Sequence, residues 1–152
     1  MVRNLVEAEV GGKGISIIRA YDPSIPALLG DPEQLIQAML NIVRNAMQAL
    51  TSPSVEHDLG RIHLRTRILR NTTVGSKFYK LAVSIKIIDN GPGIPEEMID
   101  TIFYPMISGR ADGTGLGLSI AHSIISQHKG MIECESRKGA TCFKVTLPIE
   151  ET

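Results

Sequence analysis

Residues 31–50 carry the clearest pattern in the chain, because their apolar positions recur every three to four residues, as on one side of an α-helix. Asp31 can cap free backbone N–H groups, Pro32 suits the first helical position, and Gln34 stands where a capping-box partner would. The pattern therefore predicts a helix from Asp31 to Leu50. Its apolar side is formed by Leu35, Ile36, Met39, Leu40, Ile42, Val43, Ala46, Met47 and Leu50.

Several other segments alternate apolar and polar residues, which is the period of a β-strand. Strands are predicted at residues 15–20, 61–70, 78–89, 131–136 and 141–148, with a turn at 71–77. A short helix is predicted at 96–102. A second long helix is predicted after Gly113, and its buried side would hold Ile120, Ala121, Ile124 and Ile125.

Asp89 is the last residue of the predicted strand 78–89. Because side chains alternate along a strand, Asp89 is expected on the same side as the apolar residues. The apolar side is formed by Tyr79, Leu81, Val83, Ile85 and Ile87. A carboxylate in that position needs a partner or a ligand, because burying it unpaired is costly. The alternative is that the strand ends one residue earlier and Asp89 begins the turn, which the sequence Asp-Asn-Gly favours.

Length and composition are those of one globular domain covering residues 1–152. Lys plus Arg and Asp plus Glu each number 16, so no charge excess points to nucleic acid or an anionic membrane. No apolar run is long enough to span a bilayer and no signal peptide is present, which predicts a cytoplasmic protein. Cys134 and Cys142 lack the spacing of a structural zinc site, and two free thiols are expected.

The polar side of the predicted helix 31–50 is rich in amides, where solvated helices usually carry Lys and Glu. A sector of roughly 100° holds Gln34, Gln37, Asn41, Arg44, Asn45 and Gln48. Two interpretations remain open, a solvated face and a face directed at a ligand. In the second case, amide carbonyl groups can coordinate a hard cation and amide N–H groups can donate to phosphate.

Residues 113–118, Gly-Thr-Gly-Leu-Gly-Leu, lead into the second long helix. Glycine lets a backbone approach a phosphate closely, and the free N–H groups at a helix start favour an anion, although glycine can also simply punctuate a loop. The spacing fits neither a Rossmann nor a Walker motif. An Asp next to a Thr can read the amino group of adenine, and Asn carbonyl groups can hold Mg²⁺. The combination with Asp89, Thr141 and the two Asn residues therefore suggests a complete Mg·ATP site.

The order and spacing of these motifs resemble the catalytic ATP-binding domain of the GHKL superfamily, which includes sensor histidine kinases, Hsp90, DNA gyrase and MutL. Asn41-x-x-x-Asn45-Ala46 resembles the N box, Asp89-x-Gly91-x-Gly93-Ile94 the G1 box, Ile102-Phe103 the F box, residues 113–118 the G2 box of histidine kinases, and Gly139-x-Thr141-x-Phe143 the last glycine motif. Among histidine kinases the chain is most similar to nitrogen regulation sensor kinases of the NtrB type.

The resemblance implies an α+β fold of the Bergerat type, a two-layer α/β sandwich. A mixed sheet of about five strands would carry three helices on one face. ATP or ADP, with Mg²⁺, would lie between the helices and a mobile lid at residues 104–112.

The resemblance also implies a role for each matching residue. Asn45 would bind Mg²⁺, Asn41 would act near the phosphates, and Asp89 would bind the adenine amino group. Around the ring would lie Gly91, Gly93, Ile94 and Thr141, and the phosphates would be bound by Gly113, Thr114, Gly115, Leu116, Gly117 and Leu118. Many histidine kinases carry Lys three residues after the second Asn, but Gln48 stands here. Arg44 or Arg110 would then supply the cation for the phosphates.

The implied function is transfer of the γ-phosphoryl group of Mg·ATP to a histidine of a dimerisation domain, and from there to an NtrC-type response regulator, under control of a PII signal protein. The dimerisation and sensor domains are expected N-terminal to residue 1. The chain is therefore expected to be an excised catalytic domain, monomeric alone and homodimeric in the full-length protein.

Two alternatives belong to other functional classes. An ATPase clamp like Hsp90 or MutL usually carries a catalytic Glu in the N-box helix, whereas Asn41 offers no general base. A noncatalytic regulatory module, or a related Ser-kinase-type GHKL module, would bind the nucleotide without transferring phosphate to a histidine.

Overall fold

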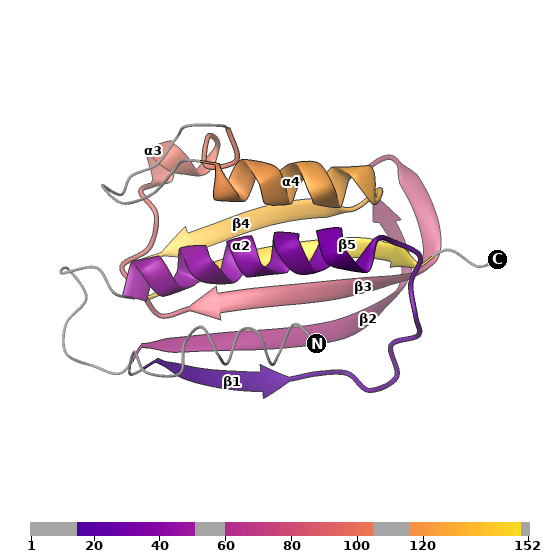
Figure 1. Cartoon of the computed structure of the whole chain (residues 1–152), viewed down its shortest axis with the longest axis horizontal. Helices are drawn as coiled ribbons and strands as arrows, with labels where there is room; N and C mark the ends of the chain where they lie inside the picture. The colour runs from indigo at the N-terminus through magenta and orange to yellow at the C-terminus, as the bar shows by residue number, and fades with distance from the viewer. Residues whose placement is uncertain (1–14, 51–59, 105–115, 150–152) are drawn as a thin grey trace.

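The computed structural model describes residues 15–50, 60–104 and 116–149 (Figure 1). Within these ranges five strands form one sheet: β1 (Ser16–Ala20), β2 (Arg61–Val74), β3 (Lys77–Asp89), β4 (Met131–Arg137) and β5 (Ala140–Ile149). Their order across the sheet is β1-β2-β3-β5-β4. Among the strands of the described residues, β1 and β2 pair in parallel and the other neighbours are antiparallel, so the sheet is mixed, as predicted.

Three helices of the described chain complete the second layer, α2 (Pro32–Leu50), α3 (Glu96–Ile99) and α4 (Gly117–Gln127). Figure 1 shows α2 and α4 side by side and antiparallel over one face of the sheet. The predicted two-layer α/β sandwich is confirmed. None of these helices is long and apolar enough to cross a membrane.

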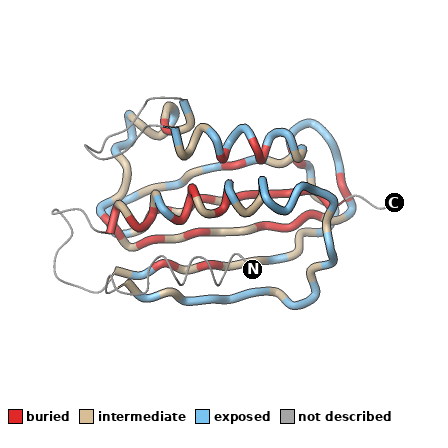
Figure 2. Tube along the Cα trace, in the orientation of Figure 1, coloured by how far each residue is buried: buried red, intermediate tan, exposed pale blue. Residues whose placement is uncertain are grey.

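The core lies between the helices and the sheet, and Figure 2 shows that the buried part of α2 is mainly its C-terminal half. Alternate residues of β3 and β5 point into it, because Ile87 pairs with Phe143 and Val83 with Leu147. The ring of Phe103 meets Phe143 edge to face, with ring centroids 6.1 Å apart. This contact anchors the segment after α3 to the centre of the core.

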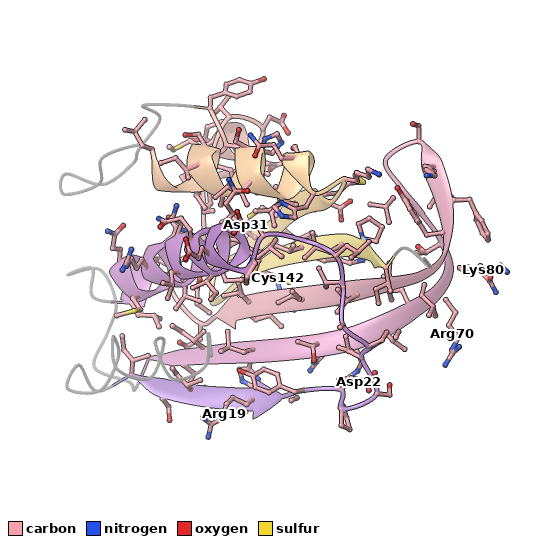
Figure 3. The ribbon with its side chains drawn as sticks, turned by 45° about the vertical axis from the view of Figure 1, so that its right-hand side comes forward. Arg19, Asp22, Asp31, Arg70, Lys80 and Cys142 are labelled. Carbon is pink, nitrogen blue, oxygen red and sulfur yellow. The ribbon has the colours of Figure 1, made fainter. Side chains whose placement is uncertain are left out.

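The N-terminal end of α2 is held by two side chains, those of Asp31 and His128. Asp31 Oδ1 accepts the backbone N–H groups of Glu33 and Gln34 at 3.0 and 3.2 Å, which confirms Asp31 as the cap. The backbone N–H of Asp31 donates to His128 Nε2 at 3.0 Å, so this partner comes from the end of α4 and not from the predicted capping box. Figure 3 shows Asp31 at the start of α2.

Two predicted boundaries and one predicted buried residue were wrong. The turn predicted at 71–77 contains only Gly75 and Ser76, because β-branched residues extend β2 to Val74 and Gly75 closes the turn with a φ of 66°. The short helix ends at Ile99 and not at residue 102, and turns continue the chain to Phe103. Ile120 is 42% exposed, because α4 buries only Ala121, Ile124 and Ile125.

Candidate functional site

Asp89 is the last residue of β3, and its side chain is only 2% exposed. Its neighbours across the sheet are Ile62 on β2 and Thr141 on β5. One carboxylate oxygen, Oδ1, accepts the backbone N–H of Gly91 at 2.9 Å. The alternative in which the strand ends before Asp89 was therefore wrong, and the sheet ends with a buried carboxylate on its helix-covered side.

The loop after Asp89 approaches its surroundings so closely that two of its glycines have no room for a side chain. A Cβ on Gly91 would lie 2.9 Å from Asp89 Oδ1 and 3.3 Å from the Cβ of Ala49 on α2. Gly93 has a φ of 90°, and a Cβ there would lie 2.7 Å from the carbonyl oxygen of Arg137. Gly139 N–H donates to the carbonyl of Gly91 at 3.1 Å, so the β4–β5 hairpin holds this loop in place.

Thr141 on β5 lies beside Asp89 and is 3% exposed. Its hydroxyl lies 2.7 Å from Ser136 Oγ on β4, and that same oxygen accepts the backbone N–H of Ile94 at 2.7 Å. Sequence analysis missed Ser136. The only signal for it was its place on the predicted strand 131–136, and that does not reveal its partner five residues later on the next strand.

The amide side of α2 is partly engaged within the protein. Asn41 is 9% exposed, its Oδ1 accepts Gln37 Nε2 at 3.0 Å, and its Nδ2 donates to the carbonyl of Gly117 at 3.1 Å. Gly117 is the first residue of α4, so Asn41 joins the two helices. Asn45, one turn further along, is half-buried, and Arg44 is exposed. The interpretation of this helix side as wholly solvated is therefore wrong at Asn41.

Most of the described candidate residues gather at one end of the molecule. Figure 1 shows the end of β3, the last turns of α2 and the first turn of α4 at the same end of the sandwich. Gly91, Gly93, Ile94 and Thr141 join Asp89 there, while Leu116 is 41% exposed and Leu118 half-buried at the start of α4. Arg110, Gly113, Thr114, Gly115 and most of the predicted lid lie outside the described residues.

The side chains around this site favour binding through oxygen and amide groups over covalent or metal chemistry based on thiols. Burial, together with the negative charges of Cys142, Asp89 and Glu135, raises the pKa of Cys134 on β4 to about 12, so its thiol stays neutral at ordinary pH. Among the described residues, no three His, Cys, Asp or Glu side chains are grouped to hold a metal ion.

The family described as histidine kinase-, DNA gyrase B- and HSP90-like ATPases matches residues 30–151. The chain belongs to this family. The matched residues include every described candidate residue of the site, from Asn41 on α2 to Thr141 on β5.

Within the histidine kinase-, gyrase B- and HSP90-like family, the chain is similar to sensory histidine kinase/phosphatases named NtrB. It is 53% identical to that of Vibrio alginolyticus over 148 residues, which are 97% of this chain and 41% of the relative. It is 53% identical to the Salmonella typhimurium protein over 137 residues, which are 90% of this chain and 38% of that relative. It is 41% identical to the Rhodobacter capsulatus protein over 143 residues, which are 91% of this chain and 38% of that relative. The chain thus spans about two-fifths of the length of these relatives.

Solved structures of histidine kinases share the fold. The catalytic domain of histidine kinase ThkA aligns with a TM-score of 0.78 at 28% identity, covering 97% of this chain and 88% of that one. The histidine kinase domain of the E. coli osmosensor EnvZ aligns with a TM-score of 0.66 at 26% identity, covering 99% and 86%. The resemblance to NtrB-type histidine kinase catalytic domains is confirmed.

Proposed function

We propose that this chain is the ATP-binding catalytic domain of an NtrB-type sensor histidine kinase. The observation that carries the proposal is the buried carboxylate of Asp89, which lies at the same end of the sandwich as the amides of α2 and the start of α4. A family of ATPases matches residues 30–151, and the relatives with 53% identity are named sensory histidine kinase/phosphatases.

The adenine end of the site would be formed by β3, β5 and the loop between Asp89 and Ile94. The carboxylate of Asp89 would accept a hydrogen bond from the adenine amino group, and Thr141 would donate to the neighbouring ring nitrogen directly or through water. Gly91, Gly93 and Ile94 would flank the ring. The glycines fit this role because the backbone there already packs against Ala49 and Arg137 with no space for side chains.

The phosphate end would lie between α2 and α4. Asn45 would hold Mg²⁺ through its amide oxygen, since Mg²⁺ prefers hard oxygen ligands that it shares with phosphates. Asn41 would act beside the phosphates, and its bond to Gly117 would fix its position relative to the start of α4. Backbone N–H groups from Gly113, Thr114, Gly115, Leu116, Gly117 and Leu118 would bind the phosphate oxygens. When bound, Mg²⁺ would neutralise charge on the phosphates during transfer.

The reaction would break the bond between the γ-phosphorus and the oxygen of ADP and form a bond from that phosphorus to an imidazole nitrogen. The chain would contribute mainly by positioning and by charge. Arg44 or Arg110 would supply the positive charge that Gln48 lacks. Within Pro32–Leu50 the single acidic residue is Glu33, in the first turn, so no carboxylate of this helix lies beside Asn41 to activate water. That arrangement favours transfer to a histidine over hydrolysis.

The acceptor histidine would belong to the dimerisation domain of the full-length, homodimeric kinase, and the next acceptor would be an NtrC-type response regulator. The greater length of the NtrB relatives leaves room for the dimerisation and sensor domains. A PII signal protein would control the full-length kinase. The isolated chain would be a cytoplasmic monomer.

A trans-phosphorylation assay tests this function. The chain is mixed with Mg²⁺, γ-labelled ATP and a separate dimeric, histidine-bearing half of an NtrB-type kinase. We expect label on that half that is labile in acid and stable in alkali, as phosphohistidine is, and no label when the acceptor histidine is replaced by Gln. Binding of ATP without label on the acceptor would contradict the kinase assignment and would favour a regulatory nucleotide-binding module.

A further inference from the structure

Ser136 lies at the centre of a short row of hydrogen bonds beneath the candidate adenine site. The residues Asp89, Thr141 and Ser136 are consecutive neighbours across β3, β5 and β4. Ser136 Oγ lies 2.7 Å from Thr141 Oγ1 and accepts the backbone N–H of Ile94 at 2.7 Å. Ser136 therefore touches both the strand and the loop that would enclose the base.

The bond from Ile94 bears on the direction of the Ser136–Thr141 hydrogen bond, in which either hydroxyl can donate. Ser136 Oγ accepts a hydrogen bond from Ile94 N–H and keeps its own proton to donate. Thr141 Oγ1 lies within reach of that proton. With Ser136 as the donor of the pair, the bonds run from Ile94 N–H to Ser136 and from Ser136 O–H to Thr141. Thr141 then keeps its own proton for a further partner.

A donating Thr141 beside the accepting carboxylate of Asp89 matches one edge of a purine. Adenine presents an amino donor at position 6 and an acceptor at N1, whereas guanine presents an acceptor at position 6 and a donor at N1. A carboxylate and a donating hydroxyl fit the adenine edge and oppose the guanine edge at both positions.

We propose that Ser136 is a positioning residue that sets the hydrogen-bond direction of Thr141 and thereby selects adenine over guanine nucleotides. The proposal rests on the proposed function, because it assumes that the base lies against Asp89. Ser136 acts through Thr141 and the backbone of Ile94 and does not itself contact the base. Replacing its hydroxyl frees Thr141 to rotate and to accept as readily as it donates.

Calorimetric titration of the 152-residue chain with Mg·ATP and Mg·GTP tests the proposal. For Ser136→Ala we expect ATP affinity to fall about fivefold to tenfold, the size of one hydrogen bond, with GTP affinity nearly unchanged. Ser136→Thr, which keeps the hydroxyl, should retain the ATP-to-GTP ratio of the unmodified chain. Ser84→Ala is the matched control, because Ser84 is buried on β3 and has the opposite parity to Asp89.

A double-mutant cycle separates positioning from a general loss of structure. In a Thr141→Val background the hydroxyl that Ser136 orients is gone, so Ser136→Ala should change ATP affinity by less than about twofold. If Ser136→Ala does not fold, as judged by circular dichroism, Ser136→Cys is used. Its thiol is a weak donor, so the ATP-to-GTP ratio should still fall.

The outcomes distinguish this proposal from the function on which it rests. If the unmodified chain does not bind ATP, both are wrong. If it binds ATP but the variants that lack the Ser136 hydroxyl lose ATP and GTP affinity equally, or lose as much in the Thr141→Val background, only the role of Ser136 is overturned.

Discussion

Asp89 is the residue on which the proposed site depends most, because a carboxylate with 2% exposure must be satisfied by the groups around it. Its parity in the strand pattern indicated its face, but the sequence Asp-Asn-Gly left open a turn that begins at Asp89, and the structure decides for the strand. Ser136 could not be predicted in the same way. Its contacts join β4 to Thr141 five residues later and to Ile94 forty-two residues earlier, and only the folded register brings those atoms together.

Replacing the carboxylate of Asp89 by an amide tests its role directly. Asp89→Asn keeps the size of the side chain and an oxygen that can accept the N–H of Gly91, so we expect the fold to be retained. The charged acceptor for the adenine amino group is lost, and ATP affinity should fall about 10-fold to 100-fold. Calorimetric titration measures the affinity, and circular dichroism checks the fold. Unchanged affinity would rule out the adenine contact.

At the scale of elements, α2 and α4 are joined by a hydrogen bond from Asn41, in the middle of α2, to Gly117 near the site, and by one from Asp31 to His128 at the far end of α4. The alternation of apolar and polar residues was enough to predict β2 and β3, and the helical period was enough to predict α2. The sequence pattern could not place the joint at His128, because it lies ninety-seven residues from Asp31. Ile120 was wrongly predicted to be buried, because the helical pattern does not show how wide a side of α4 packs against its neighbours.

The contact between His128 at the end of α4 and Asp31 at the start of α2 should stabilise the fold. His128 Nε2 accepts the N–H of Asp31, so Nδ1 carries the ring proton and donates to the carbonyl of Ile124 at 2.8 Å. His128→Ala removes both bonds, and we expect a loss of about 1–2 kcal/mol of unfolding free energy. Urea denaturation measures this value. Ser123→Ala, an exposed change on the same helix, serves as the control and should change it by less than about 0.5 kcal/mol. Equal effects of the two changes would contradict the role of His128.

Asp22, in the loop after β1, should make the stability of the fold depend on pH. The hydroxyl and N–H of Ser24 donate to Asp22 and, together with Ile68 N–H and the charge of Arg67, hold the pKa of that carboxyl below its ordinary value despite some desolvation. Figure 3 shows Asp22 in this loop. A lowered folded-state pKa stabilises the fold above the unfolded-state pKa, and this stabilisation is lost as pH falls through the folded-state value.

Urea denaturation at several pH values measures this contribution. At neutral pH the unmodified chain should be more stable than Asp22→Asn, and the difference should shrink as the pH falls below about 4. A difference that stays constant down to pH 2 would show that the carboxylate charge is not involved.

The whole molecule is a sandwich with its candidate chemistry at one end (Figure 1). The layer architecture and the strand number could be predicted from periodicity together with the family motifs. The position of β5 between β3 and β4 could not be predicted from periodicity, because it depends on contacts between distant strands. This position is what brings Thr141 next to Asp89.

Nuclear magnetic resonance mapping of Mg·ADP on the ¹⁵N-labelled chain tests the central claim, a nucleotide site at this end, most directly. We predict shift changes that cluster at Asp89–Ile94, Asn41–Asn45 and Leu116–Leu118 and spare the β2–β3 turn at Gly75. An absence of changes, or changes concentrated away from Asp89 and α2, would contradict the nucleotide site.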